Sequence, residues 1–131
     1  MEELKITIQG VPRSKKNSMN IITHPRTGRP MIVQGKAYRE YEKDAVEQIK
    51  VAHKCYHIDF PCNIKATFYR PTKVRVDLVN LLNALDDILV KAGVIEDDNW
   101  KIVVSHDGSR ILFDKDNPRT EVEITKERYG A

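Results

Sequence analysis

Carboxylates are concentrated in one segment, RVDLVNLLNALDDILVKAGVIEDDN, which runs from Arg75 to Asn99. Residues 77–98 of this segment include six acids and one lysine, although the 131-residue chain has a net charge of +3. Carboxylate oxygens are the ligands that Mg²⁺ prefers, and a bound divalent metal promotes phosphodiester hydrolysis. The segment is therefore a candidate metal site, although a solvated helix end would have the same composition.

The chain before this segment is basic. Residues 1–54 carry eleven Lys or Arg against six acids, and residues 55–76 carry four against one. A basic surface around a compact acidic site suits a protein that holds a polyanion by its phosphates and places metal against one of them. A small RNA-binding domain would also account for the basic charge, but it leaves the acidic cluster unexplained.

The overall composition is that of a soluble globular protein, with 31% charged and 40% hydrophobic residues. We expect a single domain over residues 1–131, located in the cytoplasm, because no apolar run approaches a membrane span and the amino terminus does not resemble a leader. The two cysteines, Cys55 and Cys62, are too few for a disulfide framework and are expected to be reduced thiols.

Apolar periodicity predicts the elements that would position the acids. Alternation indicates strands at residues 4–8, 63–70 and 119–127, and helical spacing indicates a helix at 38–53. Two further features are expected: a hairpin around residues 24–30, and two short strands within KIVVSHDGSRILF joined at Asp107 and Gly108. The order of these elements predicts an α/β (α+β) fold, a small mixed β-sheet with two main helices packed on it.

The second predicted helix lies within the acidic segment. Its apolar stripe consists of Leu78, Leu81, Leu82, Leu85, Ile88 and Leu89, and the opposite face of Asn80, Asn83, Asp87 and Lys91. Gly93 is expected to stop the helix. Asp77 precedes the stripe, where a side-chain oxygen caps free backbone amides, so a purely structural N-cap fits it as well as a metal ligand does.

The acidic pair Asp97 and Asp98 follows this helix. The pair would complete a site with Asp77 only if the fold returns the chain toward the start of the helix. Spacing along the sequence does not decide this point.

The acidic segment resembles the core motif of the RusA family of Holliday junction resolvases, in which an acidic D-x-D-N-L stretch opens a helix and a D-D pair follows an A-G turn. VPRSKKNSMN is similar to the amino-terminal loop of that family, and GKAYRE to the start of its first helix. The resemblance implies a small homodimeric endonuclease, often carried by prophages. Such an enzyme uses Mg²⁺ to cut four-way DNA junctions symmetrically and takes no small-molecule substrate.

Residue by residue, the resemblance makes Asp77 and Asp98 catalytic metal ligands. The chain departs from the family pattern at Val79, where many members have the second aspartate, and at Asn83, where they have a lysine. The oxygens available to replace the missing ligand belong to Asn80, Asp87 and Asp97.

Basic residues before the motif are the expected DNA contacts. These are Arg13, Lys15, Lys16, Asn17 and Arg39, and one of the loop lysines would supply the charge that Asn83 lacks. Val79 and Asn83 also keep open a second hypothesis, a protein of the same fold that binds branched DNA without cutting it.

Other residues with reactive or metal-binding side chains are weaker candidates for a functional site. The spacing of His53, Cys55, His57 and Cys62 matches no usual zinc signature. The neighbours His106 and Asp107 would suit acid–base catalysis, but such a pair in a turn is more often structural. The single aromatics Trp100 and Tyr129 are interpreted as packing residues.

Overall fold

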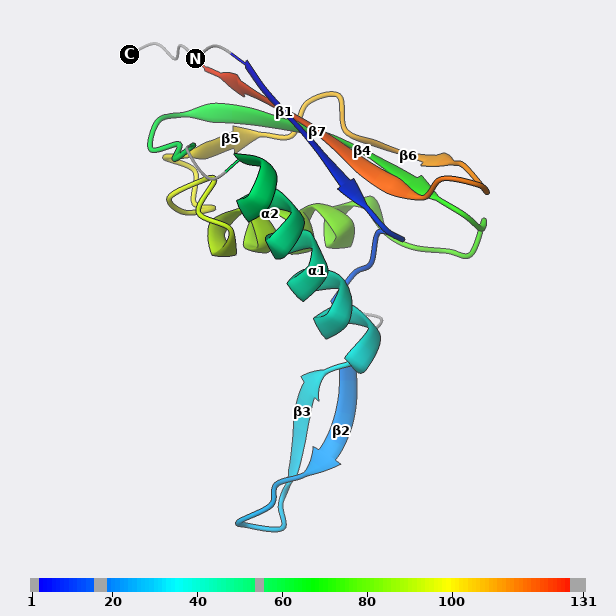
Figure 1. Ribbon diagram of the computed structural model, residues 1–131. Coiled ribbons are helices and arrows are strands. Elements are labelled where there is room, and N and C mark those ends of the chain that lie inside the picture. The colour runs from blue at the N-terminus through cyan, green and yellow to red at the C-terminus, as the bar shows by residue number, and fades with distance from the viewer. Residues whose placement is uncertain (1–2, 16–18, 54–55, 128–131) are drawn as a thin grey trace.

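The computed structural model describes residues 3–15, 19–53 and 56–127, and it has the predicted α+β architecture. In chain order the elements are β1 (Glu3–Gln9), β2 (Met19–Thr23), β3 (Pro30–Gln34), α1 (Lys36–His53), β4 (Cys62–Arg70), α2 (Leu78–Lys91), β5 (Val103–Ser105), β6 (Arg110–Phe113) and β7 (Arg119–Lys126). Both helices lie on one face of the main sheet (Figure 1). No helix among the described residues is long and apolar enough to cross a bilayer.

The main sheet is built around β4. Strand β7 lies between β1 and β4 and is antiparallel to both. Strands β5 and β6 lie on the other edge of β4 and run parallel to it, β5 beside Cys62 and Asn63 and β6 beside the Thr67–Arg70 end. The two strands predicted on either side of Asp107 and Gly108 are therefore present, and both pair with β4 rather than with each other.

The core lies between the sheet and the helices. Along β1, Leu4, Ile6 and Ile8 are buried and alternate with exposed residues, because only one face of the strand contacts the helices. Helix α1 buries Tyr38, Ala45 and Ile49. The predicted leucine stripe of α2 is also confirmed, since all of its members are buried except Leu78, which is partly buried.

Two predicted turns are confirmed. Strands β2 and β3 form a hairpin that projects away from the main sheet (Figure 1), and the His24 amide closes its turn by donating to the Arg29 carbonyl over 2.8 Å. At the end of α2, Gly93 has a φ of +80°. The Val94 amide donates to the Leu89 carbonyl and the Gly93 amide to the Val90 carbonyl, which is the Schellman arrangement.

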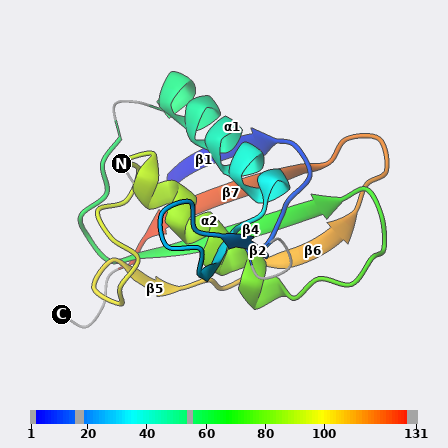
Figure 2. The same cartoon turned by 90° about the horizontal axis from the view of Figure 1, so that it is seen from below.

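The two ends of α2 point toward opposite ends of the sheet. The loop that enters α2 comes from the β6 side, and the loop that leaves it continues into β5; the two views in Figures 1 and 2 agree on this arrangement. The two parts of the acidic motif are therefore carried by different ends of α2.

Candidate active site

Asp77 occupies the N-cap position of α2, as predicted, but its side chain makes no capping hydrogen bond. The first helical bonds, from the amides of Asn80 and Leu81, go to the Asp77 backbone carbonyl at 3.1 and 3.2 Å. The exposed Asp77 carboxylate instead accepts a long bond of 3.4 Å from the Asn80 side-chain amide. Capping therefore does not account for the carboxylate, which faces solvent beside a second oxygen-bearing side chain.

Asp87 lies ten residues after Asp77, almost three turns further along the outer face of α2, where it is paired with Lys15 from the loop after β1. About a third of each side chain is exposed, 34% for Asp87 and 32% for Lys15. Because residues four apart share a helix face, the Lys15 ammonium lies one turn beyond Asn83. A loop lysine thus brings positive charge to the face of α2 where the sequence lacks the expected lysine.

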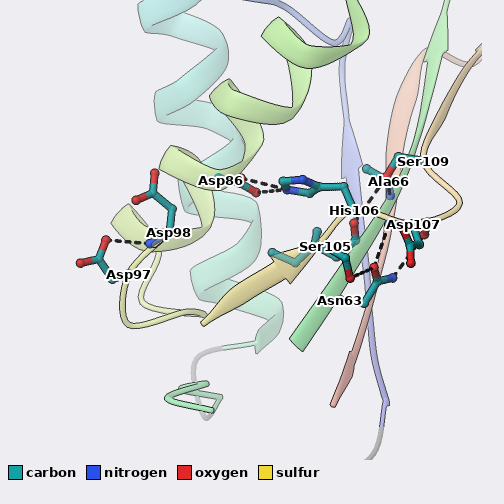
Figure 3. Close-up of polar contacts among 10 residues, drawn as sticks. Asn63, Ala66, Asp86, Asp97, Asp98, Ser105, His106, Asp107 and Ser109 are labelled. Atoms are coloured by element: carbon teal, nitrogen blue, oxygen red, sulfur yellow. Dashed lines mark hydrogen bonds and ion pairs between the residues drawn. The ribbon is translucent and has the colours of Figure 1, made fainter. Parts of the chain in front are cut away.

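Asp97 and Asp98 belong to the loop that follows α2 (Figure 3). The Asp98 amide donates to a carboxylate oxygen of Asp97 over 2.7 Å, and the Asn99 side chain donates to the other oxygen over 3.2 Å. Desolvation raises the pKa of the Asp98 carboxyl, and the hydrogen bond to Asp97 and the negative charges of Asp87 and Asp97 raise it further. Asp87, Asp97 and Asp98 therefore form one group of interacting carboxylates.

The predicted site is divided between two places. An α-helix rises 1.5 Å per residue, so the ten residues from Asp77 to Asp87 span about 15 Å along the axis of α2. Asp77 and Asn80 lie at the start of the helix, whereas Asp87, Asp97 and Asp98 gather near its end. Within the described residues, no three His, Cys, Asp or Glu side chains are close enough to hold one metal ion.

A second acid–base pair lies on the inner side of α2. Asp86 is only 5% exposed, and its two carboxylate oxygens lie 2.9 and 3.1 Å from Nε2 of His106 (Figure 3). The hydrogen bond to Asp86 raises the pKa of His106, although partial burial opposes this effect. Asn63 fixes the turn that carries the imidazole by accepting hydrogen bonds from the Ser105 hydroxyl and the Asp107 amide.

The basic residues lie around the amino-terminal loop and α1. Arg13 and Arg39 are exposed. Burial and the positive charge of Arg13 lower the pKa of Arg70, so the two guanidinium groups are close enough to repel each other. Arg70 is held in place by donating to the Pro12 carbonyl. The predicted DNA contacts Lys16 and Asn17 lie outside the described residues.

Two comparisons with known proteins identify the family of the chain. The family model described as endodeoxyribonuclease RusA matches residues 7–125. The chain belongs to the RusA family. It is also similar to the crossover junction endodeoxyribonuclease RusA of Aquifex aeolicus (strain VF5), with 27% identity over 99 residues that cover 76% of this chain and 75% of the relative. The predicted family and the prediction of an endodeoxyribonuclease are thereby confirmed.

The two departures from the RusA pattern are both at the surface. Val79 is 65% exposed in the first turn of α2, outside the leucine stripe, and Asn83 is exposed one turn later. Neither side chain packs into the core, so core packing does not explain why valine and asparagine occupy these positions.

Two features of this RusA-family chain were missed by reasoning from sequence. The Asp86–His106 pair was not predicted, although an acid beside the leucine stripe signals a buried carboxylate that needs a partner. His106 was instead considered together with Asp107, whose amide contacts Asn63. Trp100 was interpreted as a packing residue, which is wrong because 77% of it is exposed.

Proposed function

We propose that this RusA-family enzyme is a Mg²⁺-dependent endodeoxyribonuclease that resolves four-way (Holliday) DNA junctions by paired, symmetric cuts. The group of Asp87, Asp97 and Asp98 carries the proposal, because the negative charges of Asp87 and Asp97 raise the pKa of the Asp98 carboxyl, and carboxylates grouped in this way attract a cation. The Aquifex aeolicus relative is a crossover junction endodeoxyribonuclease, which supports the choice of substrate.

The chemical types of the donor atoms suit Mg²⁺, but their positions within a single chain do not. Mg²⁺ binds carboxylate and amide oxygens and keeps several waters, which matches Asp77, Asp98 and the substitutes Asn80, Asp87 and Asp97. However, three carboxylates do not converge on one point within the described part of a single chain. A bound divalent cation would neutralise the scissile phosphate and lower the pKa of a water molecule.

The residues of the chain itself perform the other tasks. Arg13 and Arg39, together with Lys16 and Asn17, hold the DNA backbone by charge and hydrogen bonding. The Lys15 ammonium is engaged by Asp87, so it limits the negative charge that an approaching phosphate meets. The carboxylates of Asp77 and Asp98 are ligands of the metal.

The substrate has a symmetry that the enzyme would share. A four-way junction contains pairs of equivalent strands, and a homodimer with a two-fold axis presents two equivalent sites to them. Two cuts within one binding event would then give two nicked duplexes.

A labelled four-way junction incubated with and without Mg²⁺ tests the proposal. Wild-type protein should cut two opposing strands only with the metal, and Asp77→Asn and Asp98→Asn should abolish cutting while keeping junction binding, because removal of negative charge does not weaken attraction to phosphate. Asp116→Asn, a change at an exposed acid in the loop before β7, should cut like wild type. Normal cutting by both test variants would refute the assigned ligands.

A second candidate function is the binding of branched DNA without cleavage. Val79 and Asn83 favour it, since neither side chain supplies the charge found at these family positions. Tight binding of the junction with no product in Mg²⁺ or Mn²⁺ would support this alternative over the nuclease.

A further inference from the structure

An open cleft lies between the loop that leads from β4 into α2 and the last residues of β6 (Figure 2). Its volume of about 310 Å³ falls within the range of small ligand sites. We call it the β6 cleft, and its lining consists of residues 70, 72–76 and 111–113. Val76 belongs to this lining and directly precedes Asp77, so the cleft lies beside a proposed metal ligand.

Large apolar side chains are exposed in the β6 cleft. Phe113 is 52% exposed, Leu112 42% and Val74 68%. They come from two segments that are distant in sequence, yet they line one cleft, so they form a joined apolar surface rather than scattered exposed residues. An exposed apolar patch with a polar rim marks a ligand-binding groove. Phe113 contributes a half-exposed aromatic ring, which can stack against another flat group.

The charged groups that line the β6 cleft are all cationic, namely Arg70, Lys73 and Arg75. The Lys73 ammonium lies 5.3 Å from the centre of the Phe113 ring, so positive charge adjoins the aromatic surface. Among the residues that the structure describes, no carboxylate forms an ion pair with any of these cations. Asp114, which follows Phe113, pairs with an arginine of β7 instead. The cleft therefore combines an apolar surface with uncompensated positive charge.

One nucleotide of DNA has both of the properties that this cleft would recognise. The faces of its base stack on aromatic rings, and an anionic phosphate lies on each side of it. A base within a duplex is covered by its neighbours, so it must leave the stack to reach the Phe113 ring. That step costs least where pairing and stacking are already interrupted. The branch point of a four-way junction is such a place, because the strands exchange partners there.

We propose that the β6 cleft binds one base that has left the helical stack at the branch point, next to the phosphate that is cut. The Phe113 ring stacks on this base, and Leu112 and Val74 flank it. Lys73 and Arg75 hold the phosphates on either side. The inference rests on the proposed function, which places a strand of the junction beside the start of α2. The cleft would favour branched DNA over a continuous duplex.

The fluorescence of 2-aminopurine tests whether a base is displaced. This base analogue is placed in turn at each nucleotide beside the branch point, where stacking quenches it, and binding is followed in EDTA so that no strand is cut. Saturating wild-type protein should raise the fluorescence severalfold at one of these positions. Phe113→Ala should lose most of that rise. Phe113→Leu keeps an apolar side chain but has no ring, so it should lose the rise as well.

Junction affinity at different salt concentrations separates stacking from charge. Phe113→Ala should weaken junction binding about tenfold and leave its salt dependence unchanged, because stacking on a base releases no counterions. Phe113→Tyr keeps a ring and should bind like wild type. Lys73→Ala and Arg75→Ala should each make the salt dependence shallower by about one unit of slope. Tyr56→Ala, which removes another exposed ring, should change neither quantity.

Continuous duplex DNA is the matched control substrate, since none of its bases is unstacked. Wild type and Phe113→Ala should bind it equally well, and an equal loss on duplex and junction would overturn the inference. Wild-type fluorescence and affinity in Phe113→Ala would overturn it too, as would a change in self-association with DNA binding intact. Thermal unfolding checks that each variant folds.

Cutting of the junction in Mg²⁺, measured separately, shows which proposal fails. If wild type cuts and Phe113→Ala binds the junction like wild type, the base-binding cleft is refuted and the nuclease stands. If wild type shows the fluorescence rise that depends on Phe113 but never cuts, the cleft is supported and the nuclease is refuted.

Discussion

The ammonium group of Lys15 lies against a carboxylate oxygen of Asp87, which ties the loop after β1 to the outer face of α2. The pair links two regions more than seventy residues apart in sequence, the basic loop and the acidic motif. It also means that the charge of Lys15 is partly committed within the protein before DNA arrives.

Lys15 and Arg39 should therefore behave differently when each is replaced by Ala. We expect Lys15→Ala to lower the cleavage rate several-fold, because Asp87 then adds uncompensated negative charge beside the phosphate, and to keep the wild-type salt dependence of binding. Arg39→Ala should make that dependence shallower by about one unit of slope. Junction binding measured over a range of salt concentrations distinguishes the two roles. If the salt dependence of binding became equally shallow in both variants, Lys15 would be a phosphate contact.

Val79→Asp should restore a ligand at the second family position. The substitution should change stability by no more than about 0.5 kcal/mol, because the site is exposed and an acid suits the first turn of a helix. We expect half-maximal cleavage at a lower Mg²⁺ concentration. Val51→Asp places the same charge on the exposed surface of α1 and should leave the titration unchanged. If Val79→Asp also leaves it unchanged, the metal is held by Asn80, Asp87 or Asp97 instead.

The Asp86–His106 pair predicts a pH-dependent stability. Because Asp86 raises the pKa of His106 in the folded protein, the stabilisation is complete below the ordinary histidine value of about 6.5 and is lost as the pH rises through the higher folded value. The free energy of unfolding of wild type should therefore fall above pH 6.5, whereas that of His106→Gln should stay level there. Urea titrations across this range provide the measurement, and parallel profiles would exclude the pair as the cause.

Gly93→Ala should destabilise the protein by about 1–2 kcal/mol, since a Cβ disfavours the left-handed conformation at this position. Gly93→Asn should cost less, because Asn tolerates that conformation. Equilibrium unfolding in denaturant compares the two variants. Equal costs would show that the positive φ is not the source of the effect.

Local patterns in the sequence were sufficient for most of the secondary structure. The leucines of α2 recur every three or four residues and end at a glycine, so both the helix and its buried face follow from the period of an α-helix. The alternation in β1 and β7 likewise predicts which side chains are buried, because successive residues of a strand point to opposite faces. The acidic motif and its family were also recognisable without a structure.

Pairing between distant segments was decided by the tertiary structure. Strands β5 and β6 have three and four residues, too few to carry a pattern, and the Asp107–Gly108 turn suits a hairpin as well as two strands along one edge. Asp86 and Asp87 are adjacent in sequence, yet the 100° turn between them directs one toward His106 and the other toward Lys15. Neither partner is specified by spacing along the chain.

The distance between Asp77 and Asp98 was likewise decided by the tertiary structure. The sequence places both residues in one motif, which predicts one site. The structure inserts a rigid fourteen-residue helix between them, and its loops leave toward opposite ends of β4. The length of a helix fixes the distance between its two ends. Two residues of one sequence motif can therefore lie far apart in space when a helix separates them.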